Sequence, residues 1–425
     1  MGNVCRICHS ETLIKFLDLG FTPLADDFLP PHRLHELEVY YPLEVFICTN
    51  CSLVQLGYVV PPEILFRRDY PYVSSTTKTG GEHFHSLAKE ASLRFGLDPT
   101  DLVVDIGSNV GVLLQGFKNQ GLINVLGIEP AESICQIARN NGIETVNRFF
   151  SKELALEIVR TKKRAKIVTG TNVVAHINDH HALVGALEIL LAEKGVFIFE
   201  APYLVTLIDN LEYDTIYHEH LSYLSIRPLV HLFRQFGMEI FDAKEVSIHG
   251  GSLRYFVARE GDYPVSDNVD RLIDLENRKK LYEIDTLSNF AKSVQNNREE
   301  LTWMLRSIKH DGKRIVGVSA PAKGMTLLNY CRIGPELLDF VTEKAPLKIG
   351  KYTPGTHIPI LPDSELIKQM PDFALLLAWN FADEIMRNLD NYRTAGGKFI
   401  IPIPHPHIVD ESQRCRFSGT ACEGT

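Results

Sequence analysis

Apolar strand-like runs alternate with amphipathic helical stretches from about residue 72 to about residue 259, and this alternation constrains the fold more than any other feature. The runs read LVVDIG, NVLGIEP, KIVTGTNV and GVFIFEAP, with helical stretches such as Ser133–Asn141 between them. Strands that alternate with helices usually pair in parallel, because each helix carries the chain back across the sheet. The pattern therefore predicts a doubly wound α/β domain.

Three further regions flank that domain. The first 70 residues hold only short apolar runs, too few to bury a core without a metal. Residues 270–310 repeat apolar side chains at helical spacing and predict a long helical connection. Four more strand-like runs follow, in KRIVGVSAPAKGMTLLNYC, ELLDFVTE, FALLLAW and KFIIPIP. We therefore predict an α/β protein whose three domains span 1–70, 71–269 and 311–425, with the helical connection before the last.

The composition argues against two classes of function. The chain has 425 residues, of which 45% are hydrophobic, and a formal net charge of −9. An acidic excess disfavours general nucleic-acid binding, which depends on clustered Lys and Arg. No apolar run approaches the roughly 18 residues that cross a bilayer, so no membrane role is expected.

Two Cys-x-x-Cys pairs predict a metal site in the first domain. Cys5 and Cys8 are followed some forty residues later by Cys48 and Cys51. Four thiolates in a tetrahedron suit zinc and leave no position for a water, so the site would be structural. Disulfides are the alternative. The chain starts MGNVCRICHS, without an apolar signal sequence, which favours a reducing cytoplasm and therefore the metal.

A glycine turn follows the first strand of the second domain, in the order Gly107-Ser108-Asn109-Val110-Gly111. Nucleotide cofactors bind at such turns because glycines let the backbone approach the ligand. The dinucleotide fingerprint G-x-G-x-x-G is absent, and the acidic Asp105 suits a cationic cofactor better than a pyrophosphate. We therefore predict S-adenosylmethionine. The alternative is a strand-turn-helix unit that binds no ligand.

Polar residues at the ends of the next two strands would complete this cofactor site. Glu129 lies about twenty residues past the turn, where a carboxylate can accept hydrogen bonds from both ribose hydroxyls. The third strand ends at Thr171-Asn172. The predicted cofactor-binding residues are Asp105, Gly107, Ser108, Asn109, Gly111, Glu129 and Asn172.

The segment IYHEHLSY places four proton-handling groups side by side: Tyr217, His218, Glu219 and His220. A neutral imidazole can remove a carbon-bound or hydroxyl proton, while a neighbouring phenol or carboxylate orients it or stabilises an oxyanion. The segment is therefore predicted to be catalytic. A polar loop whose histidines cap or solvate a strand end is the alternative.

The third domain begins with a strand, a small-residue turn and a helix start, in VGVSAPAKG. The N–H groups and dipole of a helix N-terminus favour an anion, and Lys323 would add a positive charge for a diphosphate. Tyr352 and His357 lie in a loop that would complete the pocket. A structural turn with a surface lysine is the alternative.

Together these motifs resemble the S-adenosylmethionine-dependent sugar C-methyltransferases that act on 4-keto nucleotide sugars, such as the type that makes tetronitrose. The likeness runs nearly end to end. It rests on the paired Cys-x-x-Cys, IGSN, NVVAHI (172–177), APYL (201–204), DTIYHEHLSY (214–223), HGGSLR (249–254), APAKG (320–324), PGTHIPI (354–360) and PIP (402–404). It implies an N-terminal zinc-binding domain, a central Rossmann-like class I methyltransferase domain and a C-terminal Rossmann-like domain that helps to hold the nucleotide sugar.

The resemblance also implies the reaction. The 4-keto group acidifies the neighbouring C–H, a histidine removes that proton, and the enolate attacks the methyl sulfonium. The implied catalytic residues are His220 as the base, Glu219 and Tyr217 beside it, His176 at the keto oxygen, and Tyr72, with Tyr70 as its alternative. The implied substrate-binding residues are His249, Gly250, Lys323, Tyr352 and His357.

The substrate implied is a 4-keto sugar on TDP, GDP or a similar carrier, methylated at C3 or C5 by a cytoplasmic monomer or weak dimer. Two positions depart from the family pattern. Val110 stands where members commonly carry an acid, and VTEKAPLKIG replaces the usual Asp-Arg form. O-methylation, epimerisation, or binding of cofactor and sugar without turnover are the rival functions. A pure binder needs no base, so the intact segment 217–220 favours an enzyme.

Overall fold

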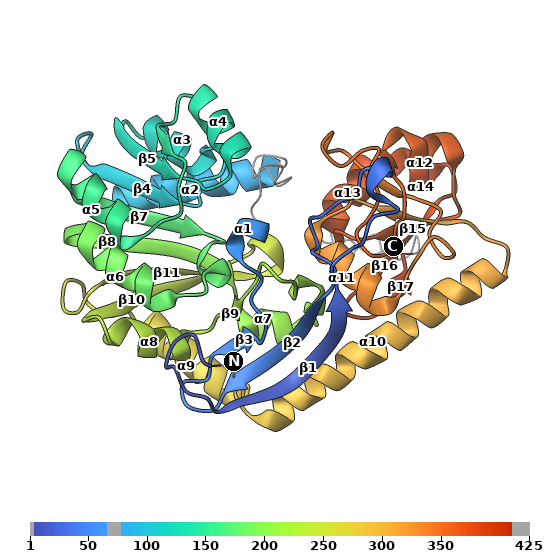
Figure 1. Ribbon diagram of the computed structural model, residues 1–425, viewed down its shortest axis with the longest axis horizontal. Coiled ribbons are helices and arrows are strands. Elements are labelled where there is room, and N and C mark those ends of the chain that lie inside the picture. The colour runs from blue at the N-terminus through green and yellow to red at the C-terminus, as the bar shows by residue number, and fades with distance from the viewer. Residues whose placement is uncertain (1–3, 66–77, 410–425) are drawn as a thin grey trace, which may run out of the picture. The chain divides into compact units, whose positions relative to one another are not determined.

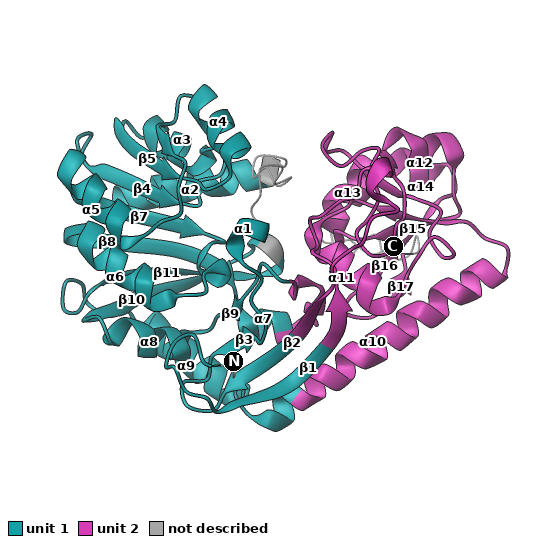
Figure 2. Ribbon diagram, viewed as in Figure 1, with its two compact units in different colours: residues 1–18, 44–207, 218–287 teal, residues 19–43, 208–217, 288–425 magenta. Residues whose placement is uncertain are grey.

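The computed structural model describes residues 4–65 and 78–409 of the chain (Figure 1). It divides into two compact units that do not follow chain order (Figure 2). The first unit contains residues 1–18, 44–207 and 218–287, and the second contains 19–43, 208–217 and 288–425. Among the described residues, no helix combines the length and the apolar character needed to cross a membrane.

The first unit is built on a seven-stranded sheet in the order β10-β11-β8-β7-β4-β5-β6. Strands β4 to β8 pair in parallel, and β11 and β10 add an antiparallel edge. The four predicted strand runs are β4, β5, β7 and β8, so the prediction of a doubly wound α/β sheet is confirmed. The strands are β4 (Leu102–Ile106), β5 (Asn124–Ile128), β6 (Thr145–Val146), β7 (Ala165–Thr171), β8 (Leu191–Pro202), β10 (Met238–Val246) and β11 (Ser252–Arg259).

Strand β4 lies where the winding of this sheet reverses. The chain leaves β4 through β5 and β6 on one side, then returns to pair β7 with the other side of β4. Open α/β sheets bind ligands beyond the carboxyl ends of the strands at such a switch point. The glycine turn after β4 therefore lies at the expected place for a cofactor.

Helices connect these strands, and three of them begin at polar caps. Side-chain oxygens of Ser151, Asp179 and Ser266 accept backbone N–H groups that would otherwise lack partners at the starts of α5, α6 and α9. Helix α2 packs against α3 over an apolar core that includes Leu87 and Phe117. The helices are α1 (Pro62–Leu65), α2 (Lys78–Arg94), α3 (Val112–Asn119), α4 (Glu132–Asn140), α5 (Lys152–Thr161), α6 (His180–Leu190), α7 (Leu204–Asp209), α8 (Ile226–Arg234) and α9 (Asp267–Arg278).

A smaller sheet carries the cysteine pairs, in the order β1-β2-β3-β9. Strand β3 is antiparallel to both β2 and β9, and β9 directly follows the predicted catalytic segment. The β3–β9 pairing therefore links the N-terminal cysteine region to the segment that holds the predicted catalytic residues. Its strands are β1 (Leu13–Thr22), β2 (Tyr41–Cys48), β3 (Val54–Leu56) and β9 (Ser222–Tyr223).

The second unit holds a six-stranded sheet in the order β14-β13-β12-β15-β16-β17, which is parallel except for β17. Its winding also reverses, at β12. The strands are β12 (Ile315–Val318), β13 (Val341–Glu343), β14 (Ile360–Pro362), β15 (Phe373–Leu376), β16 (Lys398–Ile401) and β17 (His407–Ile408). The helices are α10 (Ile284–His310), α11 (Ala322–Cys331), α12 (Ser364–Gln369), α13 (Ala382–Asn388) and α14 (Asp390–Thr394).

Two helices, α9 and α10, occupy the predicted helical connection at residues 270–310. Lys279 is the C-cap of α9, and Lys280 has a left-handed backbone with φ of 52°. A left-handed residue cannot continue a right-handed helix, so the chain turns there before α10 begins.

Candidate active site and metal centre

The glycine turn after β4 has a conformation that larger residues would not tolerate. Gly107 has φ of +66°, and a Cβ atom there would lie 2.3 Å from Val173 Cγ2. Gly111 has φ of +85°, and its Cβ would lie 2.7 Å from Ile143 Cγ1. Both contacts are below any real Cβ separation, so close packing and left-handed backbone together require glycine. Helix α3 starts immediately after this turn, as predicted.

Glu129 lies at the end of β5 and is hydrogen-bonded to the turn. Its Oε2 accepts the backbone N–H of Asn109 at 3.0 Å, and its Oε1 accepts that of Ala131 at 2.8 Å. Burial raises the pKa of this carboxyl group. Each carboxylate oxygen keeps further acceptor capacity, so the residue fits a ribose diol placed against the turn.

Two other predicted cofactor residues direct their side chains into the protein. Asp105 is buried in β4 and accepts a hydrogen bond from Thr169 Oγ1 at 2.7 Å. Burial, with the nearby charge of Glu129, raises the pKa of Asp105 to about 7. The buried Ser108 Oγ lies against Gly127, where an added Cβ would approach it to 2.4 Å. The predicted cofactor contacts of both side chains stay predictions.

One histidine that follows β7 and one from the predicted catalytic segment lie close together. Asn172 follows β7 and donates its backbone N–H to Glu200 O at 2.9 Å. The short helix η2 (Val174–His176) comes next, and its His176 ring lies 5.0 Å from the His220 ring, centroid to centroid. Burial and the neighbouring His220 lower the pKa of His176. His176 is therefore a neutral imidazole at neutral pH, able to donate one hydrogen bond from its N–H.

The remaining predicted catalytic residues have different surroundings. His218 and Glu219 are buried, whereas Tyr217 and His220 are partly exposed. The division between the two units falls between Tyr217 and His218. Tyr72 and its alternative Tyr70 lie outside the described residues.

The motif HGGSLR (249–254) begins within the short helix η4 (Ile248–Gly250). Gly250 and Gly251 have φ of 94° and 131°. The backbone conformation thus accounts for the glycines, and substrate contacts by His249 and Gly250 stay predictions.

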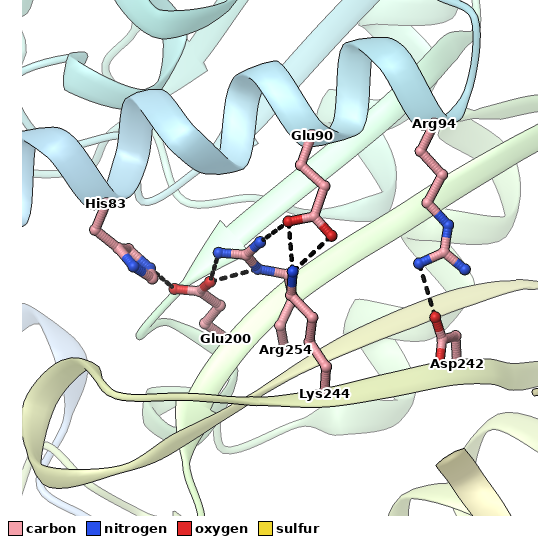
Figure 3. Close-up of polar contacts among 7 residues, drawn as sticks. All are labelled: His83, Glu90, Arg94, Glu200, Asp242, Lys244 and Arg254. Carbon is pink, nitrogen blue, oxygen red and sulfur yellow. Dashed lines mark hydrogen bonds and ion pairs between the residues drawn. The ribbon is translucent and has the colours of Figure 1, made fainter. Parts of the chain in front are cut away.

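Sequence reasoning missed a buried ionic network around Glu200, near the carboxyl end of β8 (Figure 3). Oε2 of Glu200 accepts a hydrogen bond from His83 Nε2 at 2.7 Å, and Oε1 pairs with Arg254 at 2.6 Å. Arg254 also pairs with Glu90, which binds Lys244. Burial opposes ionisation of Glu200, but the hydrogen bond from His83 and the charge of Arg254 outweigh it and hold its pKa below the usual value. The local signal in the sequence was an acid close to the carboxyl end of a strand, as at Glu129.

Replacement of Glu200 by Gln is expected to destabilise the β8–β11 region by about 1–3 kcal/mol, because Arg254 loses one of its two carboxylates while staying buried. Hydrogen exchange of the β8 and β11 amides measures this local stability. Glu157→Gln, which removes an exposed pair with Arg148, is the control and should change exchange little. Equal exchange in wild-type and Glu200→Gln protein would show that the network contributes nothing.

The four predicted metal ligands converge. The sulfur atoms of Cys5, Cys8, Cys48 and Cys51 all lie within 4.8 Å of one another, with Cys5–Cys51 at 3.4 Å and Cys8–Cys48 at 3.5 Å. Zinc about 2.3 Å from each sulfur implies tetrahedral S–S separations of about 3.8 Å, which fall within this range. The donor set therefore fits a closed structural zinc site and leaves no ligand position for a water.

The predicted substrate residues of the second unit are held by neighbours. Lys323 Nζ lies 4.6 Å above the Trp379 ring and bonds to Asn380. Burial lowers the pKa of Lys323, against the opposing charges of Asp214 and Glu212. Tyr352 pairs through its backbone with Leu29, and His357 Nε2 lies 3.1 Å from Glu38 Oε2. Their contacts with a nucleotide sugar stay predictions.

The turn after β12 repeats the arrangement seen at Glu129. Glu343, the last residue of β13, accepts the backbone N–H of Ala320 at 2.9 Å through Oε2. Its other oxygen accepts the N–H groups of Lys344 and Ala345. The sequence EK in VTEKAPLKIG thus keeps an acid where it can hold the turn, although the resemblance implies an Asp-Arg form there.

Three family models match the chain: a zinc-binding domain at residues 5–66, a methyltransferase domain at 81–243 and a C-methyltransferase C-terminal domain at 247–404. The C-methyltransferase NovU of Streptomyces niveus is 36% identical over 406 residues, which cover 95% of this chain and 96% of the relative. The chain belongs to the family of S-adenosylmethionine-dependent C-methyltransferases with a zinc-binding domain. The predictions of this family, its cofactor and its zinc-binding domain are confirmed.

Solved structures show only a distant likeness. An S-adenosylmethionine-dependent methyltransferase from Anabaena variabilis is 15% identical, with a TM-score of 0.34, over 42% of this chain and 86% of that one. Magnesium protoporphyrin IX methyltransferase from Synechocystis, with S-adenosylmethionine bound, is 14% identical, with a TM-score of 0.32, over 42% and 79%.

Proposed function

We propose that this C-methyltransferase acts on a nucleotide-linked 4-keto deoxysugar and methylates C3 or C5, next to the keto group. The observation that carries the proposal is the His176–His220 pair, whose rings lie 5.0 Å apart in the unit that contains the cofactor turn. Methyl transfer to carbon needs a carbon nucleophile, and a keto group lets a histidine generate one. A paired base and hydrogen-bond donor fit that requirement.

The two histidines take different roles in this proposal. His220, partly exposed, removes the proton from the carbon next to the keto group, and the electron pair moves onto the keto oxygen. His176, kept neutral by its lowered pKa, donates its N–H to the enolate oxygen. When bound at the glycine turn, S-adenosylmethionine supplies an electrophilic methyl group. Glu219 and Tyr217 orient His220 or stabilise the oxyanion.

The second unit binds the nucleotide in this proposal. This unit has the general plan of a nucleotide site. Its sheet has a switch point at β12, Glu343 holds the turn after β12, and helix α11 follows that turn. Lys323, Tyr352 and His357 are the proposed contacts. The family model of a C-methyltransferase C-terminal domain over 247–404 supports a function specific to this reaction. We further propose a cytoplasmic monomer or weak dimer.

The test is deuterium exchange from solvent into a panel of 4-keto nucleotide sugars, first without and then with S-adenosylmethionine. A C-methyltransferase that uses a histidine base exchanges the acidified C–H without cofactor and, with it, gives a product methylated at that carbon. An O-methyltransferase would methylate without exchange, an epimerase would exchange and invert without methylation, and a pure binder would do neither. Mass spectrometry and NMR distinguish these outcomes and identify both the sugar and the carbon.

Glu129→Ala is expected to weaken S-adenosylmethionine binding by about 1.5–3 kcal/mol, because a charge-assisted hydrogen bond to the ribose is lost. Glu129→Gln, which keeps one acceptor oxygen for the turn, separates this loss from disruption of the turn itself. Calorimetry measures cofactor affinity, and nucleotide-sugar affinity is the internal control. Unaltered cofactor affinity in both variants would place the ribose elsewhere.

A further inference from the structure

The guanidinium of Arg6 bonds to residues outside the predicted metal centre. This residue lies between the ligands Cys5 and Cys8 and is 7% exposed. Its Nη1 donates to Leu56 O at 2.8 Å, and its Nε donates to Asn178 Oδ1 at 3.0 Å. Its backbone N–H donates to Gln55 Oε1 at 3.0 Å. Coordination of a metal by Cys5 and Cys8 needs none of these bonds. The guanidinium therefore connects the segment 5–8, here called the knuckle, to two other segments.

The first of these segments leads to His220. Leu56, which accepts from Arg6, donates its own backbone N–H to Leu221 O at 3.0 Å, and Leu221 is the residue after His220. Gln55 is paired with Ser222 in the β3–β9 ladder. Arg6 therefore holds the strand that fixes the position of the His220 backbone.

The second segment leads to His176. Asn178, the acceptor for Arg6 Nε, is two residues after His176, between η2 and α6. The first turn of α6 also bonds to the knuckle, because His181 Nε2 donates a hydrogen bond to Ile7 O at 2.6 Å. The knuckle thus contacts the chain on the C-terminal side of each histidine of the proposed pair.

We propose that Arg6 is a positioning residue for methyl transfer: it fixes the His176 segment and the His220 segment to the zinc knuckle and so sets the separation of the two rings. The planar guanidinium suits this role, because its fork presents N–H groups in fixed directions to two acceptors at once. The role rests on the proposed function of the histidine pair. Misplacing reacting groups by about 1 Å can cost roughly a hundredfold in rate.

Asn178 offers the sharpest test, because it is exposed and lies outside the metal ligands and the catalytic residues. Asn178→Ala removes the acceptor for Arg6, whereas Asn178→Asp keeps an oxygen there. We expect Asn178→Ala to lower kcat about tenfold to a hundredfold with KM for S-adenosylmethionine within about twofold. Asn178→Asp should restore kcat to within about threefold of wild type. Asn140→Ala, at an exposed asparagine of α4, is the control.

Two readouts separate positioning from simple stability. Zinc content should stay at about one ion per chain in every variant. The NMR resonances of the His176 and His220 imidazoles, assigned by single substitution, should shift in Asn178→Ala, return in Asn178→Asp and not move in Asn140→Ala. Arg6→Lys, which keeps the charge but loses the fork, should reproduce Asn178→Ala.

The proposal is overturned if Asn178→Ala leaves kcat unchanged, or if kcat falls while both imidazole resonances stay in place. Failure of the proposed function has a different signature. In that case the wild-type protein exchanges no C–H of any 4-keto nucleotide sugar, yet the resonances, measured without substrate, still show whether Arg6 sets the histidine pair.

Discussion

Replacing His220 by Asn is expected to slow methyl transfer by about two to four orders of magnitude, because the amide approximates the shape of the ring but cannot accept the carbon proton. Binding of cofactor and nucleotide sugar should survive. Methyl transfer and solvent deuterium exchange need to be measured on the same variant, because a fault in methyl transfer alone could come from a misplaced methyl donor.

Neighbouring residues provide the comparison for His220. Glu219→Gln and Tyr217→Phe should cost less if these side chains only orient the base or stabilise the enolate, and each should also slow exchange. Near-normal exchange and methylation by His220→Asn, with inactive His176 or His218 variants, would assign the base to another histidine. The role proposed for His220 would then be withdrawn.

Those parts of the site that depend on local sequence could be predicted. The glycine turn could be predicted because its conformation requires glycine. At Gly107 and Gly111, φ is +66° and +85°, and an added Cβ atom would lie less than 3 Å from a neighbouring side chain. The alternation of strand and helix determines the parallel sheet, and the paired Cys-x-x-Cys spacing predicts four converging sulfurs. Each signal lies within a few residues of the structure it produces, or repeats a known ligand spacing.

The parts that depend on distant partners could not be predicted. Glu200 gains its significance from His83 on α2 and Arg254 on β11, and nothing in the local sequence of β8 indicates either partner. In the sequence, Arg6 is only one of the two residues between Cys5 and Cys8. Its proposed role depends on hydrogen bonds to Leu56 and Asn178, which the sequence does not indicate. Side-chain pairs across sheets and between segments follow from tertiary packing, for which hydrophobic periodicity carries no signal.

Val110 shows how a departure from a family pattern can be read from packing. The resemblance implies an acid at this position, and in the structure Val110 is buried with Ala131 and Ile134 at the start of α4. An acid there would lose hydration without a partner in this cluster, so an apolar residue is consistent with its surroundings. The carboxylate beside the turn is Glu129 instead, held by two backbone N–H groups.

Removing the metal is expected to unfold the sheet that carries the cysteines, because the apolar surface that its four strands bury does not replace the binding energy of zinc. Structural zinc contributes about 10–16 kcal/mol in small zinc domains near neutral pH. The purified protein should hold about one zinc per chain, measured by atomic emission. Chelation should release amide protection in β2 and β3 before it does so in β4 and β7, which belong to the larger apolar core.

The cysteine variants decide whether this expectation holds. Cys48→Ser removes one of four ligands and should lower zinc content, whereas Cys135→Ser alters a buried thiol of α4 far from the knuckle in sequence and should keep it. Because Arg6 lies between two ligands and bonds to Leu56 and Asn178, metal loss should also move the His176 and His220 resonances. Protein prepared without chelator that contains no zinc, or Cys48→Ser protein with undiminished zinc, would refute the structural metal site. Undisturbed histidine resonances in metal-free protein would instead show that the knuckle and the catalytic pair are independent.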